Sequence, residues 1–175
     1  MESETVFIRY RKALRVVMWL SPAIVLLLGS LDHFMYALSG ENAFVGMWAP
    51  VSESIWEHLK IAFYPTLFFW TVAYFVFRPL LKDRVAAWFA GAAVAAVFSA
   101  FGVVLTQYFA VEAFGLPNEI YVHIPDFFIA LCLSQAAGAH AAKLADEKKA
   151  TAILLSLAVA VTVVCVIFSV LAVAA

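Results

Sequence analysis

Five apolar runs, each long enough to cross a lipid bilayer, occupy most of this 175-residue chain. A helix needs about 20 mainly apolar residues to span the hydrocarbon core of a membrane. Hydrophobic residues make up 66% of the sequence and charged residues 13%, whereas soluble domains are about half apolar and about a quarter charged. The sequence therefore predicts an all-α membrane protein, a five-span transmembrane helical bundle that forms one domain over residues 1–175. The expected spans are residues 13–38, 55–77, 85–110, 120–142 and 150–174, with an outer loop at 39–54.

The basic residues are distributed unevenly between the two ends of the predicted spans. Ten of the eleven lysines and arginines would lie on one side of the membrane: Arg9, Arg11, Lys12, Arg15, Arg78, Lys82, Arg84, Lys143, Lys148 and Lys149. Cytoplasmic loops of membrane proteins carry an excess of Lys and Arg. We therefore predict a cytoplasmic N-terminus and an extracytoplasmic C-terminus. Lys60 is the one basic residue expected on the outer side.

The rest of the composition excludes several classes of protein. The sequence has neither a basic patch of the kind that binds nucleic acid nor a glycine-rich phosphate loop. Cys132 and Cys165 fall inside apolar runs and are interpreted as small hydrophobic side chains, not as a disulfide or a redox pair. The expected partner is the lipid bilayer, and the chain could also form a homo-oligomer.

Small residues form a stripe along the third predicted span. Gly91, Ala95 and Ser99 recur at intervals of four residues. Such stripes let two helices approach closely in a membrane, so this one predicts helix packing and not a binding site.

Histidines and carboxylates gather at the outer ends of the predicted spans. His33, His58 and His123 belong to spans one, two and four. Seven of the twelve acidic residues share this side: Asp32, Glu41, Glu53, Glu57, Glu112, Glu119 and Asp126. Ionisable groups at membrane depth are costly and often functional. Neighbouring helices of a bundle lie about 8–10 Å apart, so side chains from three spans can meet in one pocket.

Helical spacing divides the start of the second span into two faces. Intervals of three and four residues predict one polar stripe made of Glu53, Glu57, Lys60 and Tyr64. His58 follows Glu57 directly and would point about 100° away from it. Ser54 can cap the start of the helix, and Trp56 fits the aromatic belt at the outer membrane boundary.

These residue types favour a metal site on the outer side. Neutral imidazoles and carboxylates suit zinc, or manganese and iron where more oxygens join. The expected ligands are His33, His58, His123 and Asp126. Glu53 or Glu57 would be a further ligand, an orienting group or a general base. Because a metal with an open position can activate water, the site could serve a membrane-embedded hydrolase or transferase acting on a lipid or a peptide.

Two other functions fit the same residues. Carboxylates and histidines inside spans often line ion paths, so the chain could be a small transporter or a proton- or ion-coupled carrier. Few polar residues continue such a path inward: Ser99, Gln107, Ser134, Gln135 and His140. Alternatively, Glu53, Glu57 and Lys60 could join helices through a polar network, in a structural or partner protein without catalysis. The sequence leaves open whether the chain is an enzyme.

The segment from residue 32 to residue 60 resembles a known family. Its two parts are Asp32-His-Phe-Met-Tyr-Ala-Leu-Ser-Gly-Glu-Asn-Ala-Phe-Val-Gly46 and Trp48-Ala-Pro-Val-Ser-Glu-Ser-Ile-Trp-Glu-His-Leu-Lys60. They are similar to the motif of an uncharacterised family of small prokaryotic polytopic membrane proteins, in which Asn is usual at the position of Ser52. The resemblance implies a polytopic fold in a prokaryotic cytoplasmic membrane. It directs attention to His33, Glu53, Trp56, Glu57, His58 and Lys60, and it implies no particular activity.

Overall fold

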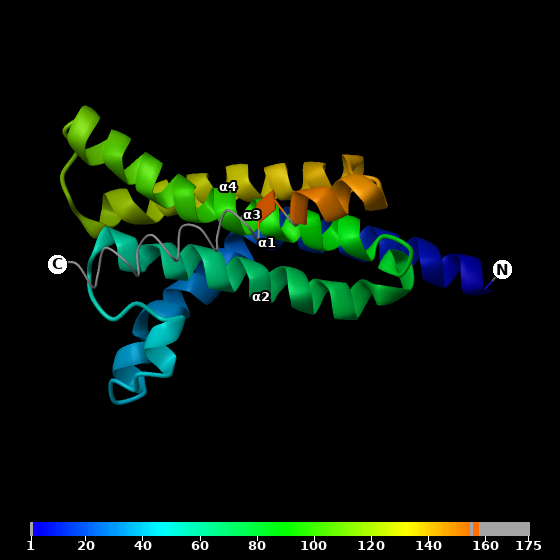
Figure 1. Ribbon diagram of the computed structural model, residues 1–175, viewed down its shortest axis with the longest axis horizontal. Helices are drawn as coiled ribbons and strands as arrows, with labels where there is room; N and C mark the ends of the chain where they lie inside the picture. Colours follow the sequence, from blue (N-terminus) through cyan, green and yellow to red (C-terminus); the bar gives the residue numbers. More distant parts are fainter. Residues whose placement is uncertain (1, 155, 158–175) are drawn as a thin grey trace.

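The protein is a bundle of long helices (Figure 1). The computed structural model describes residues 2–154 and 156–157. Four helices in this part of the chain are long and apolar enough to cross a membrane: α1 (Glu2–Leu38), α2 (Ile55–Leu81), α3 (Val85–Gln107) and α4 (Ile120–Leu144). A short 3₁₀ helix, η1 (Val45–Met47), lies in the first connection, and a π-helical segment, η2 (Tyr108–Ala113), extends α3. The described residues include no strand, and the all-α prediction is confirmed.

The observed helices follow the predicted spans closely, with one difference at the N-terminus. Helices α2, α3 and α4 begin at the predicted residues and end within a few residues of the predicted ends. Helix α1 begins at Glu2 instead of residue 13 and has 37 residues. At 1.5 Å per residue such a helix is about 55 Å long, well above the ~30 Å of a bilayer core. The fifth predicted span, 150–174, falls mostly outside the described residues, of which 147–154 and 156–157 are helical.

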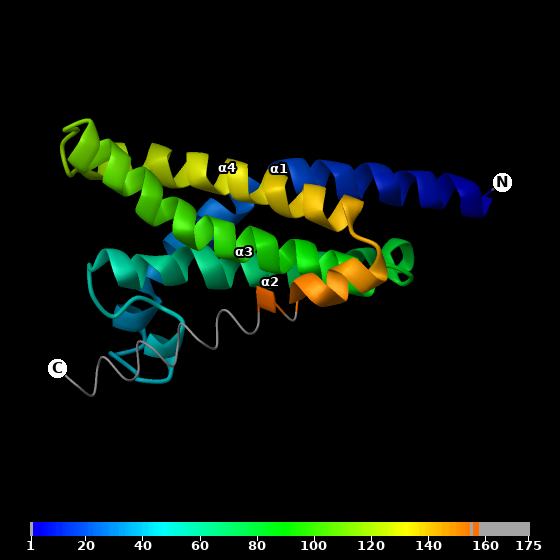
Figure 2. The same cartoon turned by 45° about the horizontal axis from the view of Figure 1, so that its top comes forward.

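The basic residues occupy one end of the bundle. Figures 1 and 2 place the N-terminus of α1, the α2–α3 connection and the C-terminal end of α4 together at that end. These segments, with the residues that follow α4, carry the ten lysines and arginines assigned to one side by the sequence. We call this the basic end, and the opposite end carries the 39–54 connection. The cytoplasmic orientation of the basic end stays a prediction.

Helices α3 and α4 approach each other closely in the bundle core, at small residues. A Cβ atom built on Gly138 would lie 2.6 Å from the carbonyl oxygen of Gly91 and 2.6 Å from the Cβ of Ala95. A Cβ on Gly91 would lie 2.6 Å from the Cβ of Ala142. Side chains larger than these would hold the two backbones apart. The predicted packing role of the small-residue stripe in α3 is therefore confirmed.

A hydrogen-bonded polar network joins α2, α3 and α4 inside the bundle. The Trp70 indole donates to Gln135 Oε1 at 2.8 Å, and Gln135 Nε2 donates to Thr66 Oγ1 at 3.5 Å. The hydroxyls of Thr66 and Ser99 lie 3.4 Å apart. All four residues are buried. Ser99 and Gln135 were among the few polar residues that could have continued an ion path inward. In the structure they form hydrogen bonds between neighbouring helices, as polar residues in membrane bundles often do.

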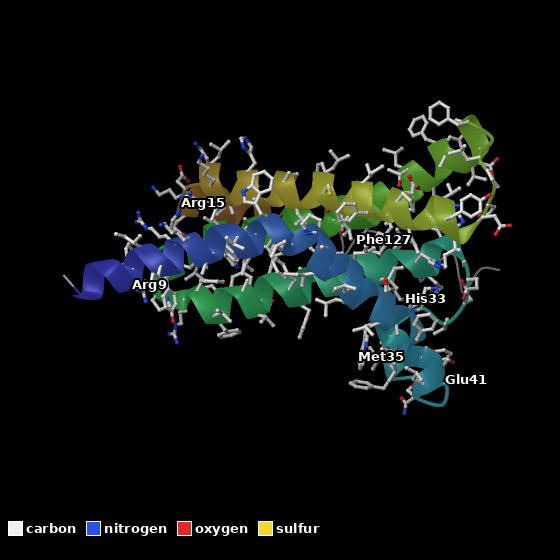
Figure 3. The ribbon with its side chains drawn as sticks, turned by 180° about the vertical axis from the view of Figure 1, so that it is seen from behind. Arg9, Arg15, His33, Met35, Glu41 and Phe127 are labelled. Atoms are coloured by element: carbon white, nitrogen blue, oxygen red, sulfur yellow. The ribbon has the colours of Figure 1, made fainter. Side chains whose placement is uncertain are left out.

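The outer end of α1 leaves the bundle after it crosses α2. At the crossing, a Cβ on Gly29 would lie 2.5 Å from the carbonyl oxygen of Ile61 and 3.2 Å from the Phe127 ring of α4. Beyond it, the last turns of α1 and the following connection project as one unit, the outer arm (residues 30–54). Figure 3 shows this arm, with His33 and Met35 on it, running away from Phe127 of α4. The arm therefore carries His33 toward the start of α2.

Candidate metal centre

Three side chains from the outer arm and the start of α2 meet at the end of the bundle opposite the basic end. His33 comes from α1, Glu53 from the connection and His58 from the first turn of α2. The Nε2 atoms of the two histidines lie 3.3 Å apart. Glu53 Oε2 lies 3.6 Å from each of these nitrogens. We call these three residues the His-Glu triangle.

The dimensions of the His-Glu triangle match those of a metal site. A point equidistant from three atoms with these separations lies about 2.0 Å from each, which is the distance of zinc from histidine nitrogen and carboxylate oxygen. Tetrahedral zinc would require edges of about 3.3 Å for such bonds. The histidine–histidine edge already has this length, and the two edges to Glu53 would need to shorten by a few tenths of an ångström.

The ring of His58 is oriented by the backbone of its own helix. Its Nδ1 lies 2.8 Å from the carbonyl oxygen of Ser54, four residues earlier. Since a carbonyl only accepts, Nδ1 is the donor, and the neutral ring then carries its lone pair on Nε2. A second hydrogen bond of this kind is what fixes the tautomer of metal-binding histidines. The backbone of Ser54 thus turns the ligand atom of His58 toward the triangle.

Glu53 reaches the triangle because the helix starts after it. Ser54 is the N-cap of α2, with an extended backbone (φ −64°, ψ 139°), and its hydroxyl accepts from the backbone N–H of Trp56 at 3.4 Å. The predicted stripe of Glu53, Glu57, Lys60 and Tyr64 is therefore wrong at its first member. Glu53 precedes the helix, so helical spacing does not govern the direction of its side chain.

The triangle has a half-buried side and an open side. The side chains of His33 and His58 are 27% and 25% exposed, whereas that of Glu53 is 82% exposed. Zinc sites that keep a fourth position free for water or substrate hold the metal through three protein ligands, and two histidines with one glutamate are such a set. The arrangement can therefore bind a divalent metal and leave one position accessible.

Glu57 and Lys60 form a separate cluster that holds the outer arm against α2. Lys60 Nζ donates to Glu57 Oε2 at 2.7 Å and to the carbonyl oxygen of Gly46 at 2.8 Å. The same Glu57 oxygen accepts from the backbone N–H of Val51 at 3.0 Å. Glu57 is thus engaged with the arm and makes none of the contacts of the triangle. This part of the motif behaves as the joining network that the sequence offered as an alternative.

The structure leaves two of the predicted ligands outside the triangle. Among the described residues, the group of three or more candidate ligands whose atoms lie within 4.8 Å of one another is His33, Glu53 and His58. His123 and Asp126 stand on α4, where His123 Nδ1 is buried without a hydrogen-bond partner. The predicted set of four is not assembled, because the outer arm carries His33 away from α4.

The other two predicted supporting residues, Trp56 and Tyr64, are exposed side chains of α2. Trp56 is 60% exposed at the start of α2, as expected for the aromatic belt, and Tyr64 is exposed and makes a T-shaped ring contact with Phe63. Sequence analysis missed the backbone groups that complete both clusters. The four-residue interval from Ser54 to His58 could have predicted one of these contacts, between the Ser54 carbonyl and the His58 ring. No pattern pointed to the contacts of Gly46 and Val51.

Comparison with known proteins places the chain in a family. A family of unknown function, DUF6512, matches residues 8–174. The chain belongs to this family. No curated protein and no solved structure matches it. The family match includes α2, α3, α4, the outer arm and the whole His-Glu triangle. The expected membership of an uncharacterised family is confirmed, and the DUF6512 description assigns no activity to any residue.

Replacing Lys60 by Met should loosen the outer arm of this DUF6512 chain. The variant loses the bonds to Glu57 and Gly46, and a hydrogen bond to a charged group contributes about 1.5–3 kcal/mol. Because both side chains are partly exposed, we expect a loss of about 1–2 kcal/mol of unfolding free energy. Limited proteolysis should cut faster within residues 39–54. Lys12→Met removes an exposed lysine from α1, far from the arm, and should leave the unfolding free energy and the cleavage rate unchanged. Equal cleavage of the two variants would contradict the bracing role.

Proposed function

We propose that this chain is a membrane protein that binds zinc, or another divalent metal, through His33, His58 and Glu53. The observation that carries the proposal is the spacing of their ligand atoms, at 3.3, 3.6 and 3.6 Å. These separations suit metal bonds of about 2.0 Å. The Ser54 carbonyl supports it further, since it presents the lone pair of His58 to the same point.

The donor set favours zinc among the divalent metals. Two imidazole nitrogens and one carboxylate oxygen suit a borderline-soft ion, whereas magnesium and calcium prefer oxygen ligands throughout. Copper(I) is disfavoured, because it prefers thiolate or thioether ligands and the three donors include neither.

The open side of the triangle supports a role beyond structure. Zinc with three protein ligands can hold and activate a water molecule at its fourth position. The outer arm also carries an exposed apolar stripe that includes Leu31, Met35 and Leu38. A substrate carried by the membrane would therefore approach the site along the arm. This arrangement is compatible with a hydrolase or transferase, and it favours a substrate that lies in the membrane.

The metal content of the purified protein tests the proposal. We expect about one equivalent of zinc after loading and desalting, as for a single three-ligand site. The His33→Ala, His58→Ala double variant should retain none. If wild-type protein takes up no more metal than the double variant, the triangle is a hydrogen-bonded contact between α1 and α2, and the proposal fails.

The proposed site faces the extracytoplasmic side. Its support is the position of the triangle opposite the basic end, together with the preference of Lys and Arg for the cytoplasm. In a background with Cys132 and Cys165 replaced by Ala, a membrane-impermeant thiol reagent added to intact cells should label Ser52→Cys and spare Lys82→Cys. Both positions are exposed in connections at opposite ends. Labelling of Lys82→Cys alone would reverse the orientation.

A further inference from the structure

A cavity opens between the helices at the basic end, far from the His-Glu triangle. It has a volume of about 190 Å³. Its walls include Leu14 and Met18 of α1, Trp70 of α2 and Ala139 of α4, and its rim includes Arg84 and Lys143. The residues of the walls are thus apolar over most of their surface, and the rim carries two positive charges.

The two positively charged side chains of the rim remain accessible to a ligand. One nitrogen of Arg84, Nη2, donates to the carbonyl oxygens of Ala142, Lys143 and Ala145 at 3.0, 3.1 and 3.1 Å. These bonds cap the C-terminal end of α4 and fix the position of the guanidinium. A guanidinium has five N–H donors, so Nε and Nη1 remain for another acceptor. Arg84 and the side chain of Lys143 are both exposed.

The cavity suits a short length of hydrocarbon. An apolar cavity of about 150 Å³ in a protein interior binds a molecule the size of benzene. A cavity of 190 Å³ can therefore take several carbons of an acyl chain. The Trp88 indole donates to the Trp70 carbonyl oxygen at 3.0 Å, and Trp70 itself donates to Gln135. Both indole N–H groups are thus satisfied inside the protein, and the rings offer the cavity their apolar surface.

We propose that an anionic phospholipid binds at this site, with its phosphate at Arg84 and Lys143 and the first carbons of one acyl chain in the cavity. Charge complementarity selects the occupant. Basic pockets between membrane helices on the cytoplasmic side bind anionic headgroups, and arginine pairs well with phosphate because its donors form a planar fork. The apolar walls add a requirement for hydrocarbon that a free phosphate ion does not meet. The proposal is independent of the metal site, which lies at the other end of the bundle.

Native mass spectrometry of the purified full chain in detergent micelles tests the lipid site. Phosphatidylglycerol should be retained as a one-lipid adduct, and phosphatidylcholine with the same acyl chains should not. Lys143→Gln should weaken retention about fivefold, as expected for the loss of one basic residue near a headgroup. Ala139→Phe, which fills the cavity, should reduce phosphatidylglycerol retention to the level of phosphatidylcholine.

The matched control is Lys82→Gln, which removes one exposed lysine from the same end outside the cavity. It should retain phosphatidylglycerol as the wild type does. The proposal is overturned if the two lipids are retained equally, or if Lys143→Gln and Lys82→Gln reduce retention to the same extent. It is also overturned if inorganic phosphate at the lipid concentration displaces the adduct, since the site would then recognise a small anion. Lys143→Gln changes only an exposed side chain, so the test does not depend on the folding of Ala139→Phe.

Discussion

Replacing His58 by Ala is expected to lower the zinc affinity of the protein by at least about 100-fold. Loss of a group that merely orients a ligand costs 10- to 100-fold in metal affinity, and His58 supplies a ligand atom itself. The two remaining donors, His33 Nε2 and Glu53 Oε2, lie 3.6 Å apart and could hold zinc only as a pair. A competition titration against a chelator of known affinity, on detergent-purified protein, measures the change directly.

The chain supplies two matched controls for this prediction. His123→Ala removes a half-buried histidine on α4, and His140→Ala removes an exposed histidine near the other end of the same helix. Both should keep the affinity of the wild type within about twofold, since neither imidazole belongs to the triangle. If His123→Ala lowered zinc affinity as much as His58→Ala does, the metal would lie between α2 and α4 and the triangle would not be its site.

Glu53 provides a graded version of the same test. In Glu53→Gln an amide oxygen stays within reach of the metal, but the negative charge is lost. We therefore expect an affinity between those of the wild type and His58→Ala. Because the Glu53 side chain is 82% exposed, its replacement should not change folding, and the affinity reports on ligation alone.

The sequence predicted the pairing of His33 and His58 but not the geometry that produces it. Both residues were assigned to the outer ends of neighbouring spans, and composition and span length suffice for that. The bend of the outer arm depends on where α1 crosses α2, at Gly29 and Ile61. That close contact is tertiary, and no local pattern specifies it. This is why His123 was expected at the site.

Helix boundaries limited the rest of the site prediction. The i, i+4 interval from Glu53 to Glu57 has meaning only inside a helix, and α2 begins at Ile55. The helical spacing from Glu57 onward did hold, because Lys60 lies three residues later, about one turn, and pairs with Glu57 at 2.7 Å. A continuous polar stripe would need a helix that reaches back to Glu53, two residues before Ile55, and the structure has two separate clusters instead.

Replacing Gly138 by Val is expected to destabilise the bundle by about 3 kcal/mol or more, at the upper end of the costs of overpacking a core. The atoms that meet the new side chain are the Gly91 carbonyl oxygen and the Ala95 Cβ, both at 2.6 Å. Neither is the end of a flexible side chain, so the helices α3 and α4 must separate. Thermal unfolding in mild detergent, followed by circular dichroism, should show a large fall in Tm.

Ala136→Val is the matched control for this prediction, because it introduces the same side chain at an exposed position of the same helix. It should change the unfolding free energy by no more than about 0.5 kcal/mol. A second pair separates crowding from helix propensity. Gly→Ala favours a helix by about 1 kcal/mol, and the atom nearest to a Cβ on Gly102 would be the Ala130 Cβ, at 3.1 Å, which is a looser contact than the 2.6 Å contacts at Gly138. Gly102→Ala should therefore be neutral or stabilising, while Gly138→Ala should destabilise. Equal stabilisation by both would mean that the backbones of α3 and α4 are not in close contact, and the small-residue stripe would lose its packing role.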